Sequence, residues 1–308
     1  MEIKKVNGNT FCVDTGMLYI PFYKINSEEI IMLDSGWAEG ERKGIEELLE
    51  ENNLRVSAII CSHAHVDHIG NNTYLKEKYN SIIAMPAYEA FICSSTVNLK
   101  LYYNIQTLSE VTEHFGHMVC ETDIMIFNNQ DSIVVRGVKF NILHTPGHSP
   151  AHICITTPDD VAYLGDTLIS YEVMRGAKMP YAFILSEDLK SKLKLYDLKC
   201  SKYIVAHKGM YNDITKLITD NISFYKERAS RILDVIDGAM TMEGILKTAI
   251  QKFNIHVKSK YKYAIVSRML RSNVEYLHET GSIELNMDDG FLKYSKVNSI
   301  RIIYIGDK

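Results

Sequence analysis

Hydrophobic and polar positions alternate along the chain with two different periods. Short β-branched and aromatic runs, with period two or fully apolar, predict strands at 10–14, 17–23, 29–33 and 56–62. Between the last two runs, Ile45, Leu48 and Leu49 recur at helical spacing and predict a helix over 40–53. A strand, a helix and a buried strand in succession predict an α/β layer.

The same pattern continues to residue 206. It predicts helices at 71–79 and 186–197, and strands at 81–85, 132–136, 138–144, 152–157, 161–164 and 202–206. The stretch 87–127 breaks this rhythm, because it combines helical spacing with many aromatic residues and few breakers. We interpret it as an insertion.

After His207 the pattern changes to long helices. Helices are predicted at 213–236, 242–253 and 263–280, followed by strands 282–285 and 291–297 around an Asp-Gly turn. Helices followed by a hairpin are typical of a small winged-helix-like α+β module. The predicted domains are therefore 1–221 and 222–308.

Composition and charge narrow the class of protein. Apolar residues make up 46% and charged residues 23%, as in ordinary globular proteins, and no run reaches the roughly 20 apolar residues of a membrane helix. The six cysteines lie far apart, which predicts reduced, mostly buried thiols and a cytoplasmic protein. The net charge is −4, but residues 222–308 hold 14 basic against 10 acidic side chains, and residues 1–221 hold 20 against 28.

A histidine cluster directly follows the strand 56–62. His63, His65, Asp67 and His68 place four ligand-type side chains within six residues at the carboxyl end of a buried strand. Imidazole nitrogens with a carboxylate oxygen favour zinc, with iron or manganese as alternatives. A solvated polar turn is the other interpretation, but it does not explain four such residues together.

Three further candidate ligands each follow a short hydrophobic strand. His148 stands in Thr-Pro-Gly-His, where the proline and glycine predict a tight turn. Asp166 follows Tyr-Leu-Gly, and His207 follows Tyr-Ile-Val-Ala. All of them can therefore converge on one edge of the sheets.

The motifs His-x-His-x-Asp-His-x-Gly, Thr-Pro-Gly-His, Gly-Asp and a late strand-terminal histidine resemble the metallo-β-lactamase superfamily over roughly residues 1–210. The resemblance implies an αββα sandwich with its site along one edge. It implies that one metal is bound by His63, His65 and His148 and a second by Asp67, His68 and His207, with Asp166 bridging both. Asp34, in Asp-Ser-Gly, would contact the metal ligands and hold them in place without binding metal itself.

Such a site would hold two divalent ions, most simply zinc, and a bridging hydroxide that acts as the nucleophile. Asp67 would bind metal and orient that hydroxide. Asp166 in the bridging position, rather than cysteine, argues against antibiotic-destroying members, and His65 rather than glutamate argues against flavodiiron reductases. The sequence points to no residue as the leaving-group acid.

The substrate is less well defined by the sequence. We expect a small acyl substrate, a thioester or lactone, contacted by Tyr171, Arg175 and Tyr181, although these side chains can equally serve packing. One alternative is a mononuclear iron oxidoreductase such as a persulfide dioxygenase. Another is a DNA-binding regulator that keeps the metal site as a sensor.

A further alternative is a phosphodiesterase or ribonuclease that uses the C-terminal module. Its third helix carries a basic cluster with interleaved tyrosines, formed by Lys258, Lys260, Lys262, Arg268 and Arg271 with Tyr261 and Tyr263. The charge is too small to decide, and a module that caps the hydrolase or forms a homodimer is the favoured interpretation. No membrane partner is expected.

Overall fold

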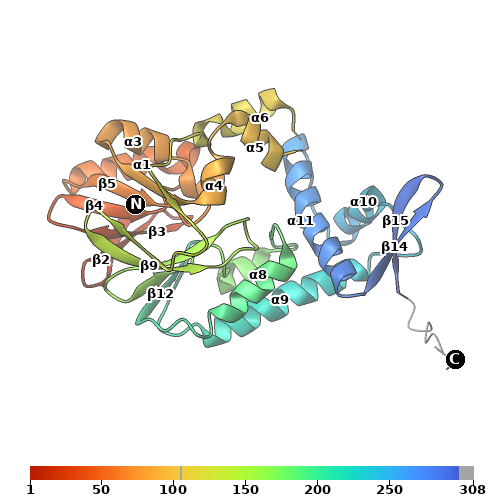
Figure 1. The fold of residues 1–308 in the computed structure, drawn as a ribbon. Helices are drawn as coiled ribbons and strands as arrows, with labels where there is room; N and C mark the ends of the chain where they lie inside the picture. Colours follow the sequence, from red (N-terminus) through yellow and green to blue (C-terminus); the bar gives the residue numbers. More distant parts are fainter. Residues whose placement is uncertain (105, 298–308) are drawn as a thin grey trace. The chain divides into compact units, whose positions relative to one another are not determined.

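Two β-sheets form the framework of the chain in the computed structural model, which describes residues 1–104 and 106–297 (Figure 1). The first sheet has the strand order β1 to β7, antiparallel from β1 to β4 and parallel from β4 to β7. Its strands are β1 Glu2–Asn7, β2 Thr10–Asp14, β3 Tyr19–Lys24, β4 Glu29–Leu33, β5 Arg55–Ile60, β6 Ile82–Pro86 and β7 Ile124–Ile126.

The second sheet has the order β13-β12-β11-β10-β9-β8. All neighbours are antiparallel except β11 and β12, so β9, β11 and β12 run in the same direction. The carboxyl ends of these three strands therefore lie at one edge of the sheet. The strands are β8 Ser132–Val135, β9 Val138–His144, β10 Ile153–Thr156, β11 Val161–Tyr163, β12 Lys202–Val205 and β13 Gly209–Tyr211.

The two sheets face each other across one apolar core. The amide of Tyr19 in β3 donates to the carbonyl oxygen of Ala206, just after β12, at 2.7 Å, and the amide of Ile153 in β10 donates to that of Ser62, just after β5, at 3.0 Å. Each sheet is therefore bonded to a strand end of the other. Ile59 and Ile60 of β5 are completely buried, as expected for a parallel strand covered on both faces.

Helices cover the outer faces of the sheets, and the expected αββα arrangement is confirmed as two mixed sheets flanked by helices (Figure 1). The helices α1 and α3 lie over the first sheet, and α8 lies over the second. The helices of this part of the chain are α1 Ala38–Glu51, α2 Val66–Ile69, α3 Asn72–Tyr79, α4 Ala87–Ile92, α5 Thr96–Tyr102, α6 Leu108–Phe115, the 3-10 helix Gly116–Met118, α7 Tyr171–Gly176, α8 Leu185–Lys194 and α9 Thr215–Leu233.

The stretch 87–127 is the crossover between the parallel strands β6 and β7. It holds α4, α5, α6 and the 3-10 helix, and its last residues form the edge strand β7 rather than part of an insertion. Sequence patterns did not delimit β1, β7, β13 or α7. The strands β7 and β13 have three residues each and α7 has six, while β1 is mostly charged and polar. Helix α6 begins with a capping box of Thr107 and Glu110.

The chain forms two compact units. The first unit consists of Met1–Ala177 and Ser186–Ile222, and the second of Lys178–Leu185 and Ser223–Lys308. The helices of the second unit, besides the end of α9, are α10 Met242–Lys252 and α11 Lys260–Glu279. The predicted folding domains 1–221 and 222–308 stay predictions, and residues 178–185 were not expected to pack with the second unit. Part of the predicted second domain, 298–308, lies outside the described residues.

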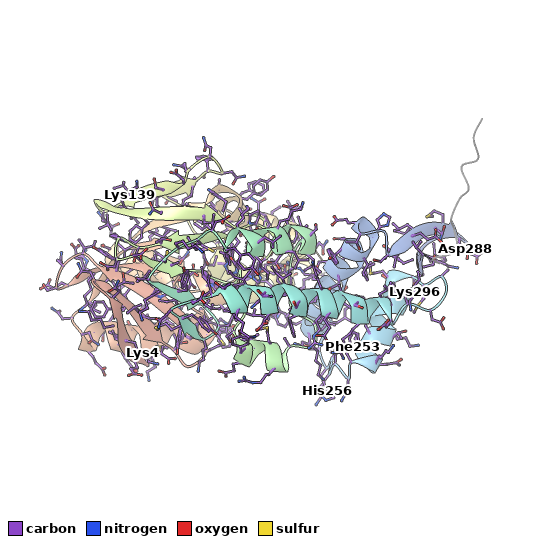
Figure 2. All side chains as sticks on the ribbon, turned by 90° about the horizontal axis from the view of Figure 1, so that it is seen from below. Lys4, Lys139, Phe253, His256, Asp288 and Lys296 are labelled. Carbon is purple, nitrogen blue, oxygen red and sulfur yellow. The ribbon has the colours of Figure 1, made fainter. Side chains whose placement is uncertain are left out.

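The predicted hairpin of the second unit is confirmed. It consists of β14 Ile283–Asp288 and β15 Phe291–Lys296, with Asp288 at the turn end and Lys296 at the far end (Figure 2). Asp289 and Gly290 form the two-residue turn with φ of 50° and 76°, the positive values that such a tight hairpin needs. The winged-helix character of this unit stays a prediction.

The prediction of unpaired, mostly buried cysteines is confirmed, since all six are free and five are buried. Among the described residues, no helix combines the length and apolar character needed to cross a bilayer.

Candidate metal centre

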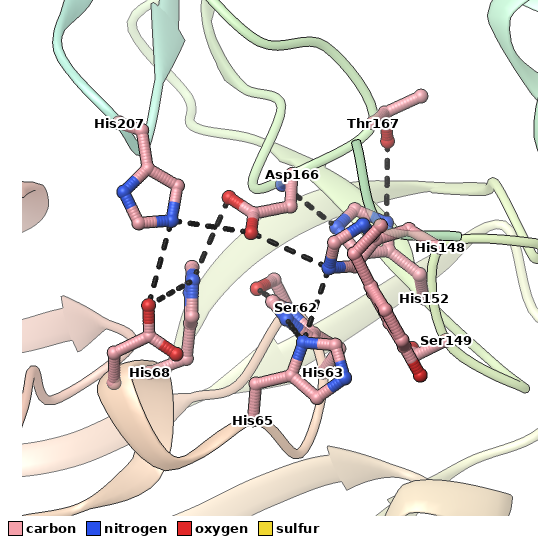
Figure 3. Close-up of polar contacts among 12 residues, drawn as sticks. Ser62, His63, His65, His68, His148, Ser149, His152, Asp166, Thr167 and His207 are labelled. Atoms are coloured by element: carbon pink, nitrogen blue, oxygen red, sulfur yellow. Dashed lines mark hydrogen bonds and ion pairs between the residues drawn. The ribbon is translucent and has the colours of Figure 1, made fainter. Parts of the chain in front are cut away.

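Strand ends bring the predicted ligands to one edge of the two sheets (Figure 3). His63 and His65 follow β5, and Asp67 and His68 lie in the short helix α2. His148 follows β9, Asp166 follows β11 and His207 follows β12, the three strands of the second sheet that run in the same direction.

The described residues hold three groups of ligand-type atoms; the predicted ligands make up two of them, and the third joins Asp34 to His63 and His68. In His63, His65, His148 and Asp166, and again in Asp67, His68 and His207, such atoms lie within 4.8 Å of one another. In the first group, Nδ1 of His65 lies 2.8 Å from Nε2 of His63 and 3.1 Å from Nε2 of His148.

Asp166 lies between the groups. Its Oδ2 is 3.3 Å from Nε2 of His148 and 3.3 Å from Nε2 of His207, and its Oδ1 is 3.5 Å from Nε2 of His68. The carboxylate therefore touches both groups at once, as a bridging ligand would.

The electrostatics of the cluster favour positive charge. Burial alone would raise the pKa values of Asp166 and Asp67, but the neighbouring His207 and His68 hold both below the usual range. Conversely, Asp166 raises the pKa of His207 to about 10. Burial lowers the pKa values of His63 and His148, which keeps these imidazoles neutral and able to donate a lone pair.

Two buried polar atoms indicate whether the residues fit a cation. Apart from their own 3.5 Å contact, Nε2 of His68 and Oδ1 of Asp166 have no hydrogen-bond partner among the described residues, although both are buried. Buried polar atoms are rarely left unsatisfied, and both atoms face the cluster. The nitrogen and carboxylate donors are those of zinc, iron or manganese sites, so the residues fit a divalent metal.

Asp34 supports the second group. Its carboxylate accepts hydrogen bonds from the amide of Ser62 at 2.6 Å, the hydroxyl of Ser62 at 2.7 Å and the hydroxyl of Tyr163 at 2.7 Å. Nδ1 of His68 lies 2.7 Å from the same carboxylate, so His68 turns its Nε2 towards the cluster.

His152 supports Asp166 in the same way. Its Nε2 accepts a hydrogen bond from the amide of Asp166 at 3.1 Å, and its Nδ1 lies 2.8 Å from the hydroxyl of Thr145. Sequence patterns had not identified His152 as part of the site. His144, by contrast, bonds the carbonyl oxygen of Gln130, and His114 that of Glu110.

The turn that carries His148 is fixed by close packing. A Cβ atom on Gly147, whose φ is 126°, would lie 2.0 Å from the amide nitrogen of Asp188 in α8. The hydroxyl of Ser191 in the same helix donates to the carbonyl oxygen of Pro146 at 2.6 Å. The tight turn expected from Pro-Gly is therefore present and requires glycine.

Two of the predicted substrate contacts, Tyr171 and Arg175, lie in the short helix α7. The hydroxyl of Tyr171 donates to Asp220 at 2.9 Å, and Arg175 is exposed at the end of α7. Tyr181 belongs to the second compact unit, where its hydroxyl accepts a hydrogen bond from Arg268 at 2.7 Å.

Sequence reasoning missed two tyrosines that contact the site. Tyr163 closes β11 and bonds Asp34, and Tyr102, the last residue of α5, lies 3.0 Å from Nε2 of His65. With a metal ion on Nδ1 of His65, Nε2 would carry the hydrogen and donate it to Tyr102. No local motif marks either tyrosine.

We expect Tyr102→Phe to lower zinc affinity by about 10-fold, the lower end of the effect seen when a partner of a metal ligand is lost. The change removes the acceptor that orients His65 and leaves the ring in place. A competition titration against a chromophoric chelator measures it. Tyr103→Phe is the matched control, because the Tyr103 ring stacks on Phe115; equal affinities in the two variants would contradict the assignment.

Comparison with known proteins gives a family match. A family model described as the metallo-beta-lactamase superfamily matches residues 22–207. An uncharacterized protein of Aquifex aeolicus is 30% identical over 130 residues, covering 42% of this chain and 54% of that protein. The hydroxyacylglutathione hydrolase GloC of Haemophilus influenzae is 28% identical over 183 residues, covering 57% and 79%.

Solved structures with little sequence identity share the fold. A metallo-beta-lactamase family protein of Thermus thermophilus superposes with a TM-score of 0.67 at 18% identity and covers 91% of this chain and 94% of its own. A beta-lactamase domain protein of Burkholderia ambifaria gives 0.69 at 14% identity, covering 96% and 94%. The chain spans only about half the length of the Aquifex relative.

Proposed function

The chain belongs to the metallo-β-lactamase superfamily, and from this premise we propose that it is a hydrolase with two divalent metal ions that cleaves a small acyl substrate, a thioester or a lactone. The observation that carries the proposal is the contact of one carboxylate, Asp166, with histidines of both candidate metal groups. A hydroxyacylglutathione hydrolase among the relatives supports the thioester class.

In this proposal the first ion is held by His63, His65 and His148, and the second by Asp67, His68 and His207, with Asp166 shared. Ions bound there lower the pKa of water towards neutrality and polarise a carbonyl oxygen. Zinc is the proposed metal, with manganese and iron as alternatives.

The protein's own residues would admit the substrate and orient the attacking water. Asp67 and His207 are each 26% exposed at the side chain, whereas His63 and His68 are buried, so substrate and water would reach the cluster from the side of Asp67. Asp67 would accept a hydrogen bond from the attacking water and orient it. Tyr171, Arg175 and Tyr181 stay predicted substrate contacts.

A panel of substrates tests this function. Zinc-loaded and manganese-loaded protein would be assayed with a hydroxyacyl thioester of glutathione, a simple aryl thioester and a lactone. Turnover of a thioester or lactone well above that of metal-free protein is the expected result, and no turnover of any acyl substrate would contradict the proposal.

We expect Asp67→Ala to lower kcat by about 10²-fold or more on the best substrate, because the second ion loses a ligand and the water loses its orienting acceptor. The change should affect kcat more than KM, since Asp67 contacts the water rather than the acyl group. Steady-state kinetics measure it, and Asp197→Ala, at an exposed aspartate, is the control. Unchanged kcat in Asp67→Ala would show that Asp67 is not catalytic.

Phosphodiester hydrolysis is the second candidate. The observation that favours it lies in the second unit, where Lys258, Lys260 and Lys262 are exposed and Tyr261 and Tyr263 are 38% and 39% exposed at the start of α11. The panel therefore also contains an aryl phosphodiester and single-stranded RNA. Binding of RNA that weakens steeply with salt would support this candidate over acyl hydrolysis.

A further inference from the structure

Glu89 is a buried carboxylate beside the metal centre that the proposed mechanism does not use. It lies in α4, immediately after β6, and its residue is only 1% exposed. Its Oε2 accepts a hydrogen bond from the amide of Ala64 at 3.0 Å, and its Oε1 accepts from the hydroxyl of Ser149 at 2.6 Å and the amide of Ala151 at 2.8 Å.

The three donors belong to two separate ligand-bearing segments. Ala64 stands between His63 and His65 at the end of β5, in the first sheet. Ser149 directly follows His148 in the turn between β9 and β10, in the second sheet. One oxygen of Glu89 therefore holds each segment.

The chemistry of this position calls for a carboxylate. All three neighbours donate, and a carboxylate is the side chain that only accepts, with lone pairs on both oxygens. Burial raises the pKa of the Glu89 carboxyl, and the three donated hydrogen bonds oppose that rise. Glutamine has the same shape, but either orientation of its amide would set an NH₂ group against a backbone amide.

Glu89 lies where it can set the distance between two of the proposed metal ligands, His65 and His148. The ring nitrogens of His65 and His148 that face each other are 3.1 Å apart and come from the two segments that Glu89 joins. The backbone on either side of these histidines is what Glu89 contacts, so its loss would let the segments move relative to each other.

We infer that Glu89 is a positioning residue that holds residues 63–65 and 148–151 in register and thereby sets the divalent-metal affinity of the group formed by His63, His65 and His148. The inference rests on the proposed function, because it takes this group to bind metal. It adds a residue outside the recognised motifs to the determinants of the site.

Glu89→Gln tests the inference. We expect its zinc affinity, measured by competition with a chromophoric chelator, to fall by about 10- to 100-fold. The visible spectrum of the cobalt-loaded protein should also change, since the angles between the ligands change. Glu41→Gln is the matched control: Glu41 is the other buried glutamate among the described residues, and it accepts from the amide of Trp37 at 2.8 Å.

Ser149→Ala is a second variant, in case Glu89→Gln does not fold. It removes one of the three hydrogen bonds and keeps the two from backbone amides, so we expect a smaller loss of affinity, of a few fold. Unchanged zinc affinity and cobalt spectrum in both variants, with only a lower unfolding temperature, would reduce Glu89 to a support of the fold and overturn the inference.

A failure of the proposed function would give a different result in the same metal-binding measurements. If the wild-type chain itself bound neither zinc nor cobalt, the metal centre and this inference would both be overturned. If the wild type bound both metals and Glu89→Gln bound them equally well, only the role of Glu89 would be wrong.

Discussion

Asp166→Asn should lower kcat/KM by about 10³-fold or more, because several kcal/mol of metal-dependent stabilisation would be lost and each 1.36 kcal/mol corresponds to a factor of ten. Asparagine keeps the shape of the side chain but removes its charge and one acceptor oxygen. Both oxygens of Asp166 face imidazole nitrogens, at 3.3 to 3.5 Å. The amide NH₂ would therefore point at a position meant for a cation.

Metal analysis accompanies the kinetics. The variant should bind at most one ion per chain, against the two proposed for the wild type, since its one remaining oxygen cannot serve both groups. Asp131→Asn, an exposed aspartate, should behave as the wild type. Two ions per chain with unchanged kinetics in Asp166→Asn would show that Asp166 does not bridge.

Removing metal from the wild-type chain should abolish hydrolysis and lower the unfolding temperature by about 5 to 10 °C. An ion present at about 100 times its Kd stabilises the fold by roughly 2.7 kcal/mol, and in a chain of this size each kcal/mol shifts Tm by about 2 to 4 °C. Dialysis against a chelator followed by differential scanning calorimetry measures the shift.

Restoration with single metals identifies the ion. Zinc or manganese should restore both activity and Tm, and chelation should shift the Tm of Asp166→Asn much less than that of the wild type. A Tm that does not respond to chelation would contradict a metal-linked fold. One iron per purified chain, without hydrolysis, would instead support the oxidoreductase alternative.

The parts of the site that lie close in sequence could be predicted from it. His63, His65, Asp67 and His68 are held by one strand end, so their proximity needs no knowledge of the fold. His148, Asp166 and His207 could be added because each follows a hydrophobic strand, and strands that run in the same direction end at the same edge. The pattern of strand ends therefore predicted that these residues converge, whereas their division between two metals came from the family resemblance.

The contacts that orient those ligands could not be predicted. Tyr102 reaches His65 from 37 positions away, and Tyr163 reaches Asp34 across 129. Such pairs depend on how helices and sheets pack, and hydrophobic periodicity carries no information about them. The same holds for Glu89, which looks like any charged residue of a short helix until its burial is known.

Asp34 satisfies two demands that few side chains can meet together. Its backbone has φ of 65°, a left-handed conformation that glycine, asparagine and aspartate adopt most readily. Its carboxylate accepts from Ser62 and Tyr163 while holding His68, which requires an anionic acceptor of that length. Glycine and asparagine meet the first demand and glutamate approaches the second, but aspartate alone meets both. A library of all twenty residues at this position should therefore yield a single fully functional amino acid.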